Sequence, residues 1–206
     1  MEIRMALDTE IYKGFKNAFH GRCFQLLVDA YHTSITAKAI QLDWNENDIS
    51  SELHERMKKN PLRVKWKIST NVEAHLPDDR TKIKGFSATF PRIDFRLTSF
   101  ISEYEYDYFF EAKNLKVSDS ALKRRYIETG IDNFVSGKYS DGSIIGYILE
   151  GATADIVIGI NSLLTKDYRD SESLALKHHS LHADYYESEH STIGSLRHFM
   201  LNFTTT

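Results

Sequence analysis

The chain has 206 residues, of which 41% are hydrophobic and 27% are charged, a composition typical of a soluble globular protein with one core. Its formal net charge of −3 provides no general basic surface of the kind common in nucleic-acid-binding proteins. The single cysteine, Cys23, excludes an internal disulfide, and no apolar run approaches the roughly 20 residues that cross a bilayer, so we expect a cytoplasmic protein without membrane contact.

The N-terminal part of the chain is predicted to be helical. Apolar residues recur at helical intervals over residues 10–42, which predicts one long amphipathic helix that can break near Gly21. A second helix is expected to begin at Asp48, a good N-cap residue, and to end at Asn60, before a proline. Its apolar side would carry Ile49, Leu53 and Met57.

The middle of the chain has the pattern of a strand meander followed by a helix. Residues 64–68 and 85–90 are predicted strands, and the polar residues 77–80 are predicted to form a turn between them. An aromatic-rich strand is expected at 104–111 and a helix at 118–136.

The C-terminal part is expected to complete the sheet. Residues 143–149 have the composition of a buried strand, and a helix over 152–164 would cover it. A polar loop at 167–173 is then followed by two closing strands at 185–188 and 196–203.

Two of these segments carry charged residues that could converge. Asp94 lies in an apolar segment, and Glu111, Ala112 and Lys113 follow, with Glu111 seventeen positions after the aspartate. Because side chains alternate between the faces of a strand, Glu111 and Lys113 point to the same side. Two converging carboxylates form the oxygen-rich pocket that suits Mg²⁺ or Mn²⁺, and a nearby ammonium can hold the attacking water. The pattern predicts a metal-dependent hydrolytic site.

From about residue 46 to 150 this arrangement resembles the PD-(D/E)xK nuclease superfamily, which has a restriction endonuclease-like fold. The resemblance implies that Asp94, Glu111 and Lys113 are catalytic, and that Asp94 and Glu111 bind the metal. In that superfamily a carboxylate from the helix before the sheet often joins the metal site, and Glu52 is the candidate for that role here. Glu73, in the first strand, is a second candidate.

The resemblance also implies an α/β fold, in which a central mixed sheet is flanked by helices and preceded by an N-terminal helical element. We expect one domain over residues 1–206, with the helical element at 1–45, a nuclease-like core at 46–165 and a C-terminal closing segment at 166–206. One departure from the superfamily pattern is Pro91, which stands three places before Asp94 rather than next to it.

Four basic residues just beyond the motif are candidates for nucleic-acid binding: Lys116, Lys123, Arg124 and Arg125. The alternative is a solvated helix face. Residues 125–151 resemble a segment of small stand-alone bacterial nucleases that are often found among defence genes. This resemblance implies DNA as the partner, a role in anti-phage defence, and assembly as a homodimer or as a subunit of a larger defence complex.

Two other functions remain open. The same fold could serve as a non-catalytic or partner-dependent subunit that interacts through its long N-terminal helix. A histidine-based hydrolase or RNase could instead be centred on residues 178–198. His178 and His182 would share a helix face there, but no glutamate stands between them as in a zinc hydrolase. The side chains in question are His178, His179, His182, Asp184 and His190, with His198 close by.

Overall fold

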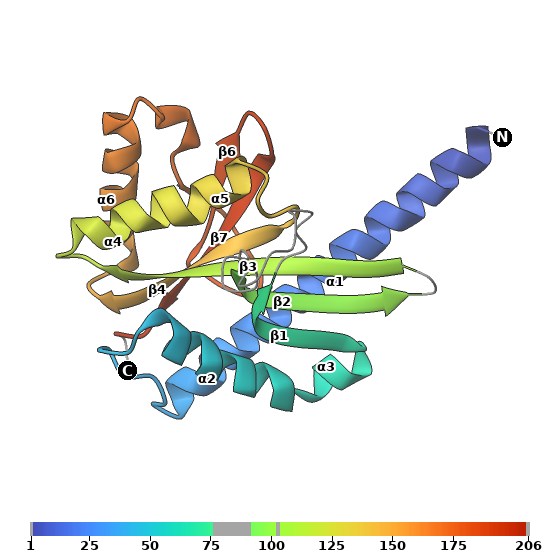
Figure 1. Cartoon of the computed structure of the whole chain (residues 1–206), viewed down its shortest axis with the longest axis horizontal. Helices are drawn as coiled ribbons and strands as arrows, with labels where there is room; N and C mark the ends of the chain where they lie inside the picture. The colour runs from blue at the N-terminus through green and yellow to red at the C-terminus, as the bar shows by residue number, and fades with distance from the viewer. Residues whose placement is uncertain (1, 76–91, 102–103, 205–206) are drawn as a thin grey trace, which may run out of the picture.

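The described part of the chain folds around one mixed sheet (Figure 1). The computed structural model describes residues 2–75, 92–101 and 104–204. The strands within them are β1 (Ile68–His75), β2 (Arg92–Ile101), β3 (Tyr104–Lys116), β4 (Gly142–Glu150), β5 (Ala175–Leu176), β6 (Tyr185–His190) and β7 (Gly194–Asn202). Their order in the sheet is β1-β2-β3-β4-β7-β6-β5. β4 runs parallel to both of its neighbours, β3 and β7, whereas the other adjacent pairs are antiparallel.

Two long helices, α1 (Glu2–Thr36) and α2 (Glu46–Lys59), pack on one face of the sheet. Their buried apolar side chains, among them Leu27 and Leu53, share a core with Phe110 and Tyr147 of the sheet. This burial explains the helical spacing of apolar residues in the sequence. The N-terminal part of α1 projects beyond the sheet (Figure 1).

Both helices differ slightly from their predicted extents. α1 starts eight residues before the predicted range of 10–42 and ends six residues before the end of that range, and it continues through Gly21, where the sequence allowed a break. α2 begins at Glu46 because Asn45, rather than Asp48, is its N-cap residue. The Asn45 side-chain oxygen accepts a hydrogen bond of 3.0 Å from the backbone N–H of Asp48, which satisfies a donor that the helix itself leaves unpaired.

The strand predicted at 64–68 is wrong. Its first two residues end a short helix, α3 (Pro61–Lys65), and the next two form a turn. The helix forms because proline is tolerated in a first helical turn and the Asn60 side chain caps the N–H of Leu62. The first strand begins only at Ile68. The strand predicted at 85–90 and the turn at 77–80 lie outside the described residues.

The opposite face of the sheet is covered by α6 (Thr153–Lys166) and by a continuous helical segment. That segment consists of α4 (Ser120–Arg125), the π-helix η2 (Tyr126–Ile131) and α5 (Asp132–Val135). Apolar residues of η2 and α6 share a second core with Ile144 and Met200 of the sheet. The helices predicted at 118–136 and 152–164, and the strand at 143–149, are confirmed.

The architecture is therefore α/β, with a mixed sheet between two helical layers, as predicted. β6 and β7 are the two closing strands, and the predicted polar loop at 167–173 contains the short 3₁₀ helix η3 (Asp170–Glu172). Among the described residues no helix combines the length and the apolar character needed to span a bilayer. Alternate residues of β3 enter the two cores: Phe110 and Ala112 face α1 and α2, which leaves Glu111 and Lys113 on the side of η2.

Candidate active site

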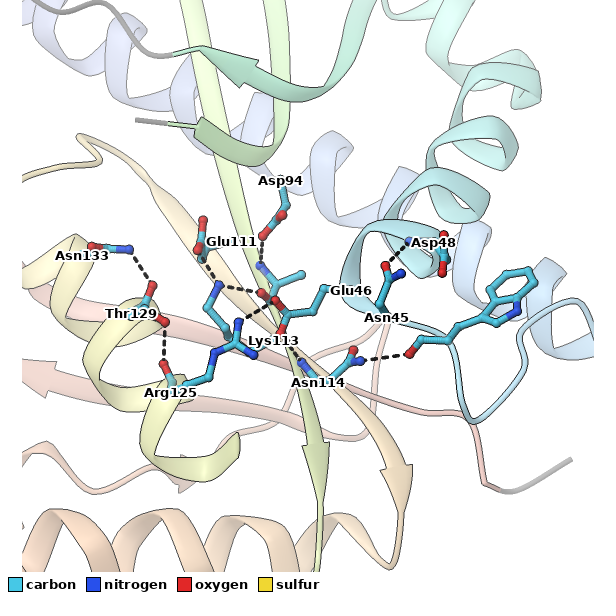
Figure 2. A network of polar contacts seen from close by, with 12 residues as sticks. Asn45, Glu46, Asp48, Asp94, Glu111, Lys113, Asn114, Arg125, Thr129 and Asn133 are labelled. Atoms are coloured by element: carbon cyan, nitrogen blue, oxygen red, sulfur yellow. Dashed lines mark hydrogen bonds and ion pairs between the residues drawn. The ribbon is translucent and has the colours of Figure 1, made fainter. Parts of the chain in front are cut away.

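Asp94, Glu111 and Lys113 are brought together on the neighbouring strands β2 and β3 (Figure 2). The register pairs Phe95 with Phe110, which places Asp94 opposite Glu111. The Lys113 ammonium lies 2.6 Å from Glu111 Oε1 and donates a hydrogen bond of 2.9 Å to the carbonyl oxygen of Ala112. Asp94 Oδ2 accepts a 2.7 Å hydrogen bond from the backbone N–H of Ala112. The three side chains singled out in the sequence thus form one cluster.

The cluster is buried and carries more negative than positive charge. Glu111 and Lys113 are each only 6% exposed. The hydroxyl of Tyr139 donates to Glu111 Oε2 at 2.9 Å, so both oxygens of this carboxylate are held in place. Burial, and then the charge of Glu111, raise the pKa of Asp94 from 3.8 to about 7, and the ammonium of Lys113 only partly opposes this. One ammonium thus lies beside two carboxyl groups, of which Glu111 is buried and Asp94 is partly exposed.

A third carboxylate, Glu46, approaches the cluster from the first turn of α2 (Figure 2). Its Oε2 accepts a 2.9 Å hydrogen bond from the backbone N–H of Asn114, and its Oε1 lies 3.1 Å from Arg125 Nη2. The charge of Glu46 contributes to the raised pKa of Asp94. The sequence reasoning missed Glu46 because it began the helix at Asp48. The N-cap pattern of Asn45 was the signal that could have found it.

Glu52, the residue expected to supply the helix carboxylate, is engaged elsewhere. Its Oε1 accepts from Arg56, one turn further along α2, at 2.8 Å from Nε and 2.6 Å from Nη2. Six residues separate it from Glu46, which corresponds to about 9 Å along the helix axis. Glu73 is exposed on β1, with a left-handed φ of 48°. Of the two helix carboxylates, Glu46 rather than Glu52 therefore lies near Asp94.

The π-helix η2 forms the wall beside Lys113. Gly130 in this helix packs against Ile144, and a Cβ added to it would lie 3.7 Å from Lys113 Cγ and would overlap the end of the Ile144 side chain. A π-helical turn is rare and changes the register of the side chains that follow it. Here the glycine allows η2 to approach the sheet closely enough to cover the Lys113 side chain.

The donor atoms at the cluster fit a hard divalent cation in type. Asp94, Glu111 and Glu46 offer carboxylate oxygens, and Ala112 offers a carbonyl oxygen, which are the ligands that Mg²⁺ and Mn²⁺ prefer. Among the described residues, however, no three His, Cys, Asp or Glu side chains lie close enough together to bind a metal ion. The Lys113 ammonium instead contacts Glu111 Oε1 and the Ala112 carbonyl, so it supplies the positive charge at these oxygens.

The four basic residues beyond the motif have separate environments. Lys116 and Arg125 line a pocket next to Glu46. Lys123 is only 7% exposed, and its ammonium donates to the backbone oxygens of Lys116 and Val117 at 3.1 and 2.9 Å. Arg124 pairs with Asp167 on the outer side of α4. Two of the four predicted residues are therefore placed next to the carboxylates, whereas Lys123 has a structural role.

Two of the C-terminal histidines belong to a buried chain of hydrogen bonds. Tyr126 hydroxyl lies 2.9 Å from His198 Nδ1, and the Ser188 hydroxyl lies 2.7 Å from both His198 Nε2 and His190 Nε2. His190 Nδ1 lies 2.7 Å from a Glu172 oxygen. The order of serine, histidine and carboxylate matches that of a catalytic triad, but Ser188 is only 1% exposed, so a substrate cannot reach it. Burial lowers the pKa of His198 to about 3, which keeps it neutral.

The other histidines of this segment have separate environments as well. His182 Nε2 lies 2.8 Å from the Met200 carbonyl oxygen, and His179 packs on Tyr185 and Phe199. Residues 177–184 are not helical, so His178 and His182 do not share a helix face. The described structure offers no open histidine site to support the hydrolase alternative.

No family model matches the chain, and neither the curated proteins nor the solved structures contain one that is similar to it.

Proposed function

We propose that this protein is a metal-dependent endonuclease that hydrolyses the phosphodiester bonds of DNA. The observation that carries the proposal is the cluster of Asp94, Glu111 and Lys113, in which a buried ion pair lies beside a carboxyl group of raised pKa, with Glu46 close enough to contribute to that pKa. Carboxylates placed next to each other in a largely desolvated site are costly in a folded protein, and such arrangements are common at functional sites.

The roles follow from the contacts. Asp94, Glu111 and Glu46 would hold Mg²⁺ or Mn²⁺. When bound, the ion would act as a Lewis acid on the phosphate and would lower the pKa of a coordinated water. Lys113 holds the attacking water or a phosphate oxygen and offsets the negative charge that develops during attack. The water oxygen forms the new bond to phosphorus while the bond to the leaving deoxyribose oxygen breaks; the proton lost by the attacking water passes to solvent, and a solvent proton neutralises the leaving oxygen.

Neighbouring groups keep these residues in position. Tyr139 fixes one oxygen of Glu111, and the Asn114 backbone fixes one oxygen of Glu46. The layered sheet and a carboxylate from the preceding helix support the resemblance to the restriction endonuclease-like core, with Glu46 in the place first given to Glu52. DNA as the substrate, a role in anti-phage defence, and a homodimer or larger defence complex remain part of the proposal on the basis of that resemblance. A cytoplasmic location remains part of it on the basis of the sequence composition.

The test is cleavage of supercoiled plasmid by the purified protein with Mg²⁺, with Mn²⁺ or with EDTA. We expect nicking that requires the metal and is lost in Glu111→Gln and Lys113→Ala, whose folding is checked by circular dichroism. Glu187→Gln removes a carboxylate from the distant strand β6 and serves as the charge-matched control. Cleavage that persists in EDTA would refute the proposal. A folded wild-type protein that never cleaves would favour the non-catalytic or partner-dependent subunit.

A further inference from the structure

A pocket of about 480 Å³ lies directly beside the carboxylate cluster. It opens at the C-terminal ends of the parallel strands β3 and β4, between the start of α2 and the helix α4. This edge of a parallel sheet is a common place for ligand binding, because the loops there diverge. Glu46 belongs both to the pocket wall and to the cluster, so a ligand in the pocket would lie next to the proposed reaction centre.

Two cations at the pocket, Lys116 and Arg125, have N–H donors that no group in the described structure uses. The Lys116 ammonium has no hydrogen-bond or ion-pair partner in the part of the chain that the structure describes. Arg125 is half exposed, with 53% of its side-chain surface accessible, and it uses a single N–H toward Glu46. Because a guanidinium has five donors, most of them are left for a ligand. This pair of cations suits the phosphate groups of a polynucleotide.

Most of the remaining lining suits the base of a nucleotide, and Asp43 adds a second carboxylate besides Glu46. Leu122, Leu149 and Trp44 provide apolar surface, and Asn45, Asn47 and Asn114 provide amide groups. Among the described residues, the side-chain oxygen of Asn114 has no hydrogen-bond partner, although its amide nitrogen donates to the Trp44 carbonyl oxygen at 3.1 Å. An unpaired buried acceptor favours a ligand with N–H donors, and the edges of the bases carry such donors.

We propose that this pocket binds one unpaired nucleotide of the substrate, adjacent to the phosphate that is cleaved. The proposal rests on the proposed nuclease function and makes the substrate single-stranded at this position. The volume of about 480 Å³ lies within the range of small-ligand pockets, about 300–1,000 Å³, and is sufficient for one nucleotide. A base that is stacked and paired in a duplex has to leave the stack before it can enter such a pocket. Lys116 and Arg125 hold the phosphates, and the apolar wall holds the base.

Binding can be tested without cleavage. We would measure the affinity of the full-length protein in EDTA for a fluorescein-labelled single strand of 15 thymidines and for the same strand in a duplex, over a range of salt concentrations. We expect the single strand to bind about tenfold more tightly than the duplex. Lys116→Gln should weaken single-strand binding about fivefold and lower the salt slope by about 0.7, the value for one lost phosphate contact.

Two further variants separate the pocket from general charge. Lys177→Gln also removes one lysine charge, but from an exposed position outside the pocket, and should leave the affinity for the single strand unchanged. Asn114→Leu removes the unpaired acceptor of the pocket without changing charge and should weaken single-strand binding, with folding checked by circular dichroism. Equal or tighter duplex binding, an unchanged salt slope in Lys116→Gln, or no binding of either probe would overturn the pocket proposal. Because these assays need no metal, the outcome is independent of whether the protein cleaves DNA.

Discussion

Replacement of Asp94 by asparagine should make the protein more stable and inactive at the same time. The pKa of Asp94 is raised from 3.8 to about 7, chiefly by burial and then by Glu111. A difference of about three between the two pKa values corresponds to about 4 kcal/mol at pH values above both. Asp94 is partly exposed, so water screens some of this cost, and we expect a gain of about 2 kcal/mol.

The raised pKa of Asp94 determines how the stability difference between wild type and Asp94→Asn changes with pH. A carboxyl group whose pKa is raised in the folded state stabilises the folded protein fully only while it is protonated. That contribution is lost as pH rises from 3.8 to about 7, because the folded state must release a proton that it binds more tightly than the unfolded state does. Asparagine resembles the protonated form and can still accept the Ala112 N–H. The advantage of Asp94→Asn should therefore be largest at about pH 8 and smaller at about pH 5.

The assay is urea unfolding of wild type and Asp94→Asn at both pH values, repeated with saturating Mg²⁺. Mg²⁺ should stabilise the wild type, by about 2.7 kcal/mol at a concentration one hundred times the Kd, and should have far less effect on the variant. Asp48→Asn, which alters an exposed carboxylate on α2, should show neither effect. A variant less stable than wild type at about pH 8, or one with an unchanged response to Mg²⁺, would refute the reasoning.

Three other substitutions test separate parts of the site. Glu46→Gln should reduce plasmid cleavage at least about a hundredfold, whereas Glu52→Gln on the same helix should stay within about twofold, and the reverse result would restore the original assignment. Gly130→Ala should destabilise the protein by about 1–3 kcal/mol in thermal unfolding because η2 is tightly packed, while Gly21→Ala, which has open space, should stabilise by about 0.5–1 kcal/mol. Ser188→Ala should cost about 1–3 kcal/mol of stability yet leave cleavage by the folded protein unchanged; complete loss of activity would revive the histidine-based alternative.

Local patterns in the sequence were sufficient for most elements that bury one face. The helical spacing in α1 and α2 and the apolar run of β4 identified their types, because burial against the sheet imposes a regular spacing on apolar residues. The predicted start of α2 was less accurate, because the choice between Asn45 and Asp48 as the N-cap residue depends on one hydrogen bond. At residues 64–65, in the strand predicted at 64–68, a helix that begins with a proline and an asparagine cap outweighed the strand-like composition.

In the candidate site, too, some features were predictable from local sequence patterns and others were not. Alternation along a strand placed Glu111 and Lys113 on one side, and the register of β2 and β3 then set Asp94 opposite them. The partners Glu46 and Tyr139 come from elements 65 and 28 residues away from Glu111 in sequence, and no short spacing connects them to the motif.

The amino-acid sequence by itself determined most helices and strands and the common side of Glu111 and Lys113, because these follow from side-chain spacing within one segment. The α/β class and the inclusion of Asp94 came from the resemblance of the sequence to a known family. The tertiary structure alone decided that the third carboxylate is Glu46, that only Lys116 and Arg125 of four basic residues line the adjacent pocket, and that Ser188 is closed to solvent. These outcomes depend on how separate segments pack against one another, and burial and long-range contacts are properties of the folded chain as a whole.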